Sequence, residues 1–202
     1  MYANISMEKF IDARHRFFQW RNELDYARMT MLALAFAFLT GMSSFVRVYT
    51  PISAVPFTLQ TFIVLMSGMV LGHKWGGISQ TLYVGLALAG IPWTTQGGGF
   101  DAVFGYTGGY LLGFIIAAFV VGYLTDLDAK YRTAKFQVPI MTLGMLLIYI
   151  PGVAVLSAIT SMPLMGMNGA IMLGAGVFII WDIVKLAMAG AAGKFLLTKK
   201  AF

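Results

Sequence analysis

Two residues of opposite charge, Asp182 and Lys185, stand three positions apart in an apolar segment near the end of the chain. Residues at this spacing share one face of a helix. Each charge inside a membrane helix costs about 2.5–3.5 kcal/mol on insertion scales, so such residues usually face a cavity or a partner. We expect the pair to form the polar end of a ligand pocket, in which Lys185 holds an anionic group and Asp182 accepts N–H hydrogen bonds. The alternative is an ion pair that only locks the last helix.

A second candidate is the glycine-rich stretch Pro92–Tyr110, in which Gly97, Gly98 and Gly99 are consecutive and Trp93 stands near the start. Glycine allows backbone to approach a ligand closely and to adopt positive φ. Glycines among aromatic residues suit a lid over a partly apolar small molecule. The alternative is an ordinary loop between helices with interfacial aromatic residues.

Three small residues, Ala33, Ala37 and Gly41, recur at a spacing of four in the first apolar segment. Small residues at this spacing let helices approach closely in lipid. They predict either a contact with a partner protein or packing inside the helix bundle.

The elements that position these residues must lie in a membrane. Of the 202 residues, 59% are hydrophobic and 11% are charged, and the mean hydropathy is +0.79. Soluble domains contain roughly 25% charged residues. The apolar runs are continuous rather than alternating, which favours helices over a β-barrel. We predict an all-α, polytopic membrane protein.

Six apolar segments predict six transmembrane helices, and residues 29–202 then form one transmembrane substrate-binding domain. Residues 1–28 carry both charges with apolar residues at helical spacing, which favours an amphipathic helix at the membrane surface over a disordered tail. Residues 168–177, broken by glycines, predict a short helix or a re-entrant piece. The six segments are 29–48, 55–71, 76–92, 106–124, 138–160 and 178–198.

Lysine and arginine predict the orientation. With six spans, the basic clusters before the first span, in two of the connections and at the chain end all fall on one side. The positive-inside rule then places both termini in the cytoplasm of a multi-pass cell-membrane protein and the loop 93–104 outside. The same rule explains the net charge of +6 without a nucleic-acid partner.

The sequence lacks the residues that several kinds of chemistry require. The chain has no cysteine, which excludes disulfides, iron–sulfur clusters and thiolate metal sites. It has no P-loop, no H-E-x-x-H and no G-x-S-x-G motif. We expect no bound metal and no enzymatic activity.

Four motifs, taken together and in order, resemble the BioY family, the biotin-binding S-components of energy-coupling-factor (ECF) transporters. The motifs are VPFTLQTF at Val55–Phe62, YVGLALAGIP at Tyr83–Pro92, GYTGGYLLGF at Gly105–Phe114 and WDIVK at Trp181–Lys185. The resemblance implies an S-component-like bundle of six helices that binds biotin from outside. It also implies a transmembrane coupling protein and two cytoplasmic ATPases as partners. ATP would be used only by those partners, and no cofactor is expected.

The resemblance also implies roles for particular residues. Asp182 and Lys185 become ligand contacts, Tyr110 belongs to the same substrate region, and Gly97–Gly99 become the lid. Some family members have an asparagine in the glycine-rich loop, and here Gln96 is expected to take that amide role, with Trp93 beside the pocket. The stripe of Ala33, Ala37 and Gly41 would meet the coupling protein.

Two alternative functions stay open. The chain is either an S-component for another small anionic vitamin or a secondary transporter that works without ATPases. An intramembrane enzyme would need a catalytic set that the sequence lacks.

Overall fold

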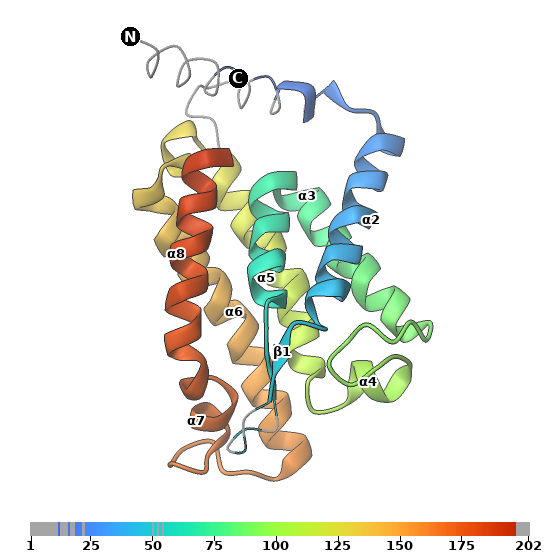
Figure 1. The fold of residues 1–202 in the computed structure, drawn as a ribbon, viewed down its shortest axis with the longest axis vertical. Helices are drawn as coiled ribbons and strands as arrows, with labels where there is room; N and C mark the ends of the chain where they lie inside the picture. The colour runs from blue at the N-terminus through green and yellow to red at the C-terminus, as the bar shows by residue number, and fades with distance from the viewer. Residues whose placement is uncertain are drawn as a thin grey trace.

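The computed structural model describes residues 12, 16, 19–21, 23–49, 51, 53 and 55–196. In this part of the chain the fold is a bundle of long helices joined by short elements (Figure 1). The elements are α2 (Tyr26–Ser43), β1 (Arg47–Val48), β2 (Phe57–Thr58), α3 (Gln60–Leu88), α4 (Phe100–Phe104), α5 (Gly108–Asp126), η1 (Ala129–Arg132), α6 (Ala134–Thr160), α7 (Ala170–Gly174), η2 (Gly176–Phe178) and α8 (Ile179–Leu196).

The second and third predicted spans are the two halves of α3. The helix is broken at Gly72, whose φ is +80°. Hydrogen bonds join Gln60 to Tyr83 and Ser67 to Gln80, pairs placed on either side of the break. The two halves therefore lie against each other as a helical hairpin. A glycine stands at the reversal because side chains strongly disfavour positive φ.

Helix α5 packs between α3 and α6, while α2 packs on α3, and α8 packs on α6 and α3. Glycine allows the closest approaches. The backbone of Gly68 in α3 faces the Ala118 carbonyl of α5, and Gly113 in α5 faces the backbone of Ile148 in α6. Small residues let helix backbones approach in this way, as in membrane bundles generally.

Three helical stretches of the described chain are long and apolar enough to cross a membrane: Gly108–Asp126, Lys135–Thr160 and Ala170–Ala189. The last includes α7 and η2, so residues 168–177 do hold the short helix that the glycines predicted. The all-α prediction omitted a small antiparallel sheet, in which Arg47 pairs with Thr58 and Val48 with Phe57.

The small-residue stripe of α2 faces the interior. Ala33 and Ala37 have no exposed surface, and a side chain at Gly41 would overlap the Trp93 ring. The expected contact of this stripe with a coupling protein does not agree with this geometry, because residues without exposed surface cannot touch another subunit. Packing inside the bundle, the alternative, does agree. The exposed face of α2 carries bulkier residues such as Leu34 and Phe38.

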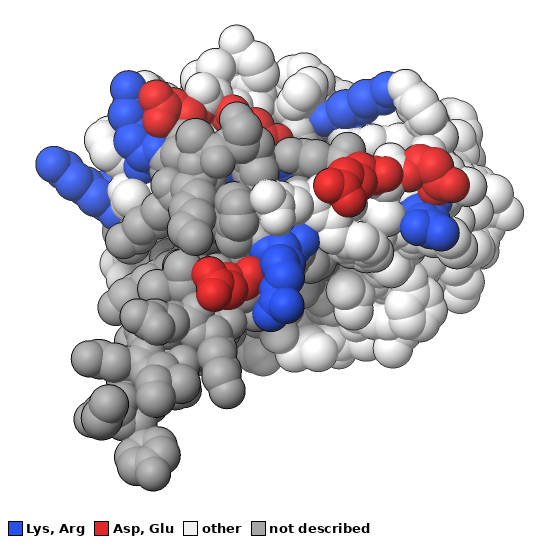
Figure 2. All heavy atoms as spheres, turned by 90° about the horizontal axis from the view of Figure 1, so that it is seen from above, with Lys and Arg blue, Asp and Glu red and all other residues white. Residues whose placement is uncertain are grey.

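One end of the bundle, here called the charged end, holds the start of α2, the Gly72 turn and the end of α5. Lys, Arg, Asp and Glu side chains gather on it (Figure 2). Arg21 donates to the Val70 carbonyl at 3.0 Å, and both Arg21 and Arg132 pair with the Asp126 carboxylate, at 3.4 and 3.7 Å. Burial lowers the pKa of the Arg132 guanidinium, and Asp126 opposes this shift. Most of the predicted amphipathic segment 1–28 lies outside the described residues.

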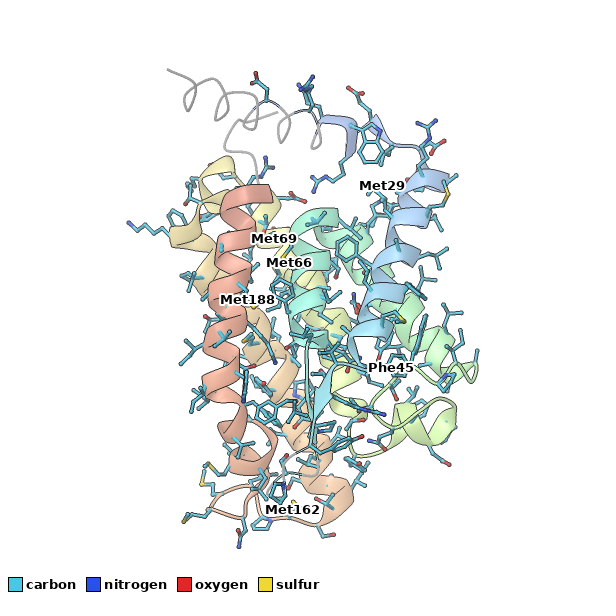
Figure 3. All side chains as sticks on the ribbon, in the orientation of Figure 1. Met29, Phe45, Met66, Met69, Met162 and Met188 are labelled. Carbon is cyan, nitrogen blue, oxygen red and sulfur yellow. The ribbon has the colours of Figure 1, made fainter. Side chains whose placement is uncertain are left out.

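The opposite end, here called the cavity end, holds the small sheet, α4 and α7 (Figure 1). Figure 3 shows the buried Met66 and Met69 in the half nearer the charged end, with Phe45 and Met162 in the other half. The described charged residues nearer the cavity end are few. They are Arg47, Asp101, Asp182 and Lys185.

Candidate ligand-binding site

A cavity lies between the helices at the cavity end, and the space inside it, together with its opening to solvent, is about 510 Å³. The first turn of α3, the sheet, α5, α6, η2 and α8 all contribute to it. The lining residues are Val55, Pro56, Phe57, Thr58, Gln60, Thr61, Thr95, Thr107, Tyr110, Leu111, Phe114, Tyr149, Phe178 and Lys185.

Lys185 and Asp182 form a buried ion pair beside this cavity. Lys185 Nζ lies 3.1 Å from Asp182 Oδ1, and each residue is 7% exposed. Lys185 also donates to Thr61 Oγ1 at 3.0 Å, and the Tyr149 hydroxyl donates to Asp182 Oδ2 at 2.5 Å. Helices α3, α6 and α8 therefore meet through one hydrogen-bonded chain of four side chains.

These hydrogen bonds leave one N–H donor of Lys185 for a ligand. An ammonium group has three N–H donors. Thr61 and Asp182 take two of those on Lys185, and Lys185 lines the cavity. A ligand anion can accept the third. The pair therefore joins α8 to the bundle and also faces a cavity, so the two interpretations of the D-x-x-K spacing are compatible.

Aromatic rings form one wall. Tyr149 stacks on Phe178 with ring centroids 6.2 Å apart, and Phe57 meets Phe178 edge to face at 4.6 Å. Phe114 lines the cavity from α5. Such a wall suits a flat or apolar ligand body, while the polar groups set its orientation.

Two of the predicted site residues lie at this cavity directly. They are Lys185 and Tyr110, and the Tyr110 hydroxyl donates to the Gly174 carbonyl at 2.8 Å. Asp182 is connected to the cavity through Lys185 and Tyr149. Gln96 is connected to the cavity through the lining residue Thr107, because its Nε2 donates to Thr107 Oγ1 at 2.6 Å.

The structure does not bring the rest of the predicted loop into the cavity lining. Gly97 and Gly99 have φ of +93° and +92° and shape a tight turn, with Thr94 and Gly97 bridged. Trp93 does not line the cavity, and its indole N–H donates to the Tyr83 carbonyl at 3.1 Å. Between residues 93 and 104 the lining residue is Thr95, and Thr107 and Tyr110 line the cavity from the end of the glycine-rich stretch.

Sequence reasoning missed Gln60, Thr61 and Tyr149 as site residues. Gln60 and Thr61 stand in the VPFTLQTF motif, which carried the resemblance without any assigned role. Polar residues at the start of an apolar span were a usable signal, because a membrane helix tolerates them best where they face a cavity or a partner. Tyr149 had no such signal, since a tyrosine in an apolar helix is common.

No group of three or more metal-ligating side chains occurs among the residues that the structure describes.

Comparison with known proteins agrees on one family. The sequence profile of the BioY family matches residues 13–200. A probable biotin transporter BioY of Methanothermobacter thermautotrophicus is 39% identical over 68% of this chain and 90% of its own length. The biotin transporter BioY of Thermotoga maritima is 37% identical over 69% of this chain and 79% of its own.

A solved structure has the same fold. The crystal structure of the S-component for biotin from an ECF-type ABC transporter superposes with a TM-score of 0.74 and 26% identity, covering 84% of this chain and 90% of that one. With a profile match over nearly the whole sequence and these relatives, the chain belongs to the BioY family.

Proposed function

We propose that this chain is the biotin-binding S-component of an ECF transporter. It takes biotin from the outer side and delivers it to an ATP-driven coupling module. The observation that carries the proposal is the buried Lys185–Asp182 pair at the edge of a cavity lined by aromatic and polar side chains. The names of the relatives support biotin as the ligand.

Biotin matches the chemistry of the cavity. It has a fused ring with N–H and C=O groups, an apolar chain and one carboxylate. Lys185 supplies a cation for the carboxylate, and Gln60 supplies an acceptor oxygen for an N–H group, while Asp182 holds Lys185 in place. The rings of Phe57, Tyr149 and Phe178 supply an apolar surface. The protein is a transport subunit and does no chemistry on its ligand.

Six spans are proposed: α2, the two halves of α3, α5, α6 and α8. The halves of α3 are short for a bilayer of ~30 Å, and local thinning or burial in the bundle would accommodate them. The charged end then lies in the cytoplasm with both termini, and the cavity end faces outside. The loop with Gly97–Gly99, which borders the cavity through Thr95, is proposed as the outer cover.

The partners proposed are a transmembrane coupling protein and two cytoplasmic ATPases, which alone would use ATP. The coupling surface must lie on exposed helix faces, since the α2 stripe is buried.

Titration of the purified protein with biotin tests the function. Tryptophan fluorescence can follow binding, because Trp181 lies against Phe57 at the cavity. Saturable binding that other vitamins do not displace is expected. Displacement by a different anionic vitamin would favour the alternative S-component.

Uptake assays separate the S-component from a secondary transporter. Biotin uptake is expected in cells that contain a coupling module and not in cells that lack one. Equal uptake in both would favour the secondary transporter.

Cysteine labelling tests the orientation, since the chain has no cysteine of its own. Asp101→Cys at the cavity end should react with an impermeant reagent from outside, and Lys130→Cys at the charged end should not. Gly98 is a poorer position, because a side chain there would overlap the backbone of Gly90 and Ile91.

A further inference from the structure

Gln60 presents a polar group to the cavity in a defined orientation. It is the first residue of α3, is 3% exposed and lines the cavity. Its Nε2 donates to the hydroxyl of Tyr83 at 2.7 Å. A side-chain amide has two donors on nitrogen and acceptors on oxygen, so the direction in which it points decides what it can recognise.

The surroundings of Tyr83 set that direction. Tyr83 has no exposed surface, and its hydroxyl donates to the Trp93 carbonyl at 3.4 Å. Buried backbone carbonyls are nearly always paired, which holds the single hydroxyl proton on this carbonyl. The hydroxyl can then only accept from Gln60, so the NH₂ group of Gln60 faces Tyr83 and its Oε1 is left for the cavity.

We infer that Gln60 is a specificity-determining residue that accepts a hydrogen bond from a ring N–H of the ligand, and that Tyr83 is its positioning residue. The inference rests on the proposed binding of biotin, whose cyclic urea carries such N–H groups. Neighbouring residues on a helix point about 100° apart. Thr61 is bound to Lys185, while Gln60 turns to Tyr83. The acceptor and the cation therefore occupy different sides of the cavity, which suits a ligand with a donor ring and a separate anion.

The test compares three ligands by titration. They are biotin, an analogue methylated on the ring nitrogens, and an analogue whose ring carbonyl is a thiocarbonyl. Methylation removes the donor, and sulfur weakens the acceptor. In the wild-type protein, methylation should weaken binding roughly five- to hundredfold, since the buried Oε1 loses its partner.

Gln60→Met keeps a similar shape without the amide, and should reduce the methylation penalty to about that of its added bulk alone. Tyr83→Phe should lower the penalty partly, because the amide is no longer held. Gln80→Met is the matched control. Gln80 is also fully buried in α3 but is bonded to Ser67, Ser79 and Thr40 away from the cavity, so the wild-type penalty should persist.

The outcomes are distinct. An unchanged methylation penalty in Gln60→Met would overturn the inference while biotin binding itself stands. If Gln60→Met instead abolishes the penalty of the thiocarbonyl analogue, the NH₂ group of Gln60 donates to the ring carbonyl of the ligand. That result would also overturn the inference. If Gln60→Met does not fold, Tyr83→Phe decides the question by the same measurement, the ratio of the affinities for biotin and for its methylated analogue. Failure of the wild-type protein to bind biotin would overturn the proposed function and this inference with it.

Discussion

Two charge clusters lie at opposite ends of this protein, and they differ in what surrounds them. At the charged end, Asp126 lies between Arg21 and Arg132, next to the Gly72 turn. At the cavity end, Lys185 and Asp182 are bonded to Thr61 and Tyr149, and Lys185 lines a cavity.

The two clusters differ in what their hydrogen-bond donors face. Arg21 donates to Asp126 and to the Val70 carbonyl beside the turn. The cluster at the charged end therefore joins segments of the chain to each other. Lys185 keeps a donor directed at a space that a ligand can fill. Buried ion pairs are weak indicators of stability by themselves. The comparison shows that a cavity beside the pair is what marks a binding site. Substitutions at the charged end should therefore change stability, and those at the cavity end should change affinity.

The largest effect is expected for Lys185→Ala. Removing the cation leaves the ligand carboxylate buried without a partner, and such truncations cost roughly 2–5 kcal/mol, or about 30-fold to several thousand-fold in affinity. A biotin analogue with a neutral amide in place of the carboxylate should lose much less from the substitution. Titration of both ligands measures this.

The opposite result has a clear form. If Lys185→Ala weakens both ligands equally and lowers the melting temperature without ligand, the pair is a structural lock like the one at the charged end.

Gly72→Ala should give the next largest effect, on stability. The residue has φ of +80°, and a Cβ there would overlap the Asp126 carboxylate. Strain and overpacking together should lower the free energy of unfolding by about 2–4 kcal/mol. Thermal unfolding measures this, and biotin affinity of the folded fraction should be unchanged.

Gly85→Ala is the matched control in the same helix. A Cβ there meets nothing within 4 Å. Its stability should equal or exceed that of the wild type, since alanine is the better helix former. Equal destabilisation by both substitutions would rule out the turn as the cause.

Tyr149→Phe sharpens the comparison within the cavity. It removes the hydroxyl that donates to Asp182 and keeps the ring that stacks on Phe178. Hydrogen bonds to charged groups contribute about 1.5–3 kcal/mol, so biotin affinity should fall roughly tenfold or more. Calorimetric titration would detect it, and wild-type affinity would show that the Asp182 carboxylate does not need this donor.

The smallest effects are expected for Arg21→Gln and its control, Lys130→Gln. Arg21 is buried and bonded to Val70 and Asp126, so its loss should cost about 1–2 kcal/mol of stability. Lys130 pairs with Asp128 at the surface at 3.7 Å, and exposed pairs contribute at most about 1 kcal/mol. Chemical unfolding of both variants makes the comparison. Biotin affinity that falls in Arg21→Gln would show that the two clusters are coupled.

The sequence supported much of the fold and part of the site. Apolar segment lengths anticipated the helices, including both halves of α3, and the D-x-x-K spacing anticipated the pair at 3.1 Å. Both follow from local rules of helix periodicity and charge burial. The α2 stripe shows the limit of such rules, because small residues permit close packing without saying against which helix. Ala33 and Ala37 turned out to pack inside.

Composition and spacing alone determined that the chain is helical, that it belongs in a membrane and that Asp182 and Lys185 share a helix face, since each depends on residues near one another in sequence. The tertiary structure alone decided which residues share the cavity. Gln60, Tyr149 and Lys185 lie on α3, α6 and α8, and only the packing of these helices brings them together. It also decided that Gly97–Gly99 shape a turn instead of lining that space. Contacts between distant segments depend on how whole helix faces fit, which no local pattern contains.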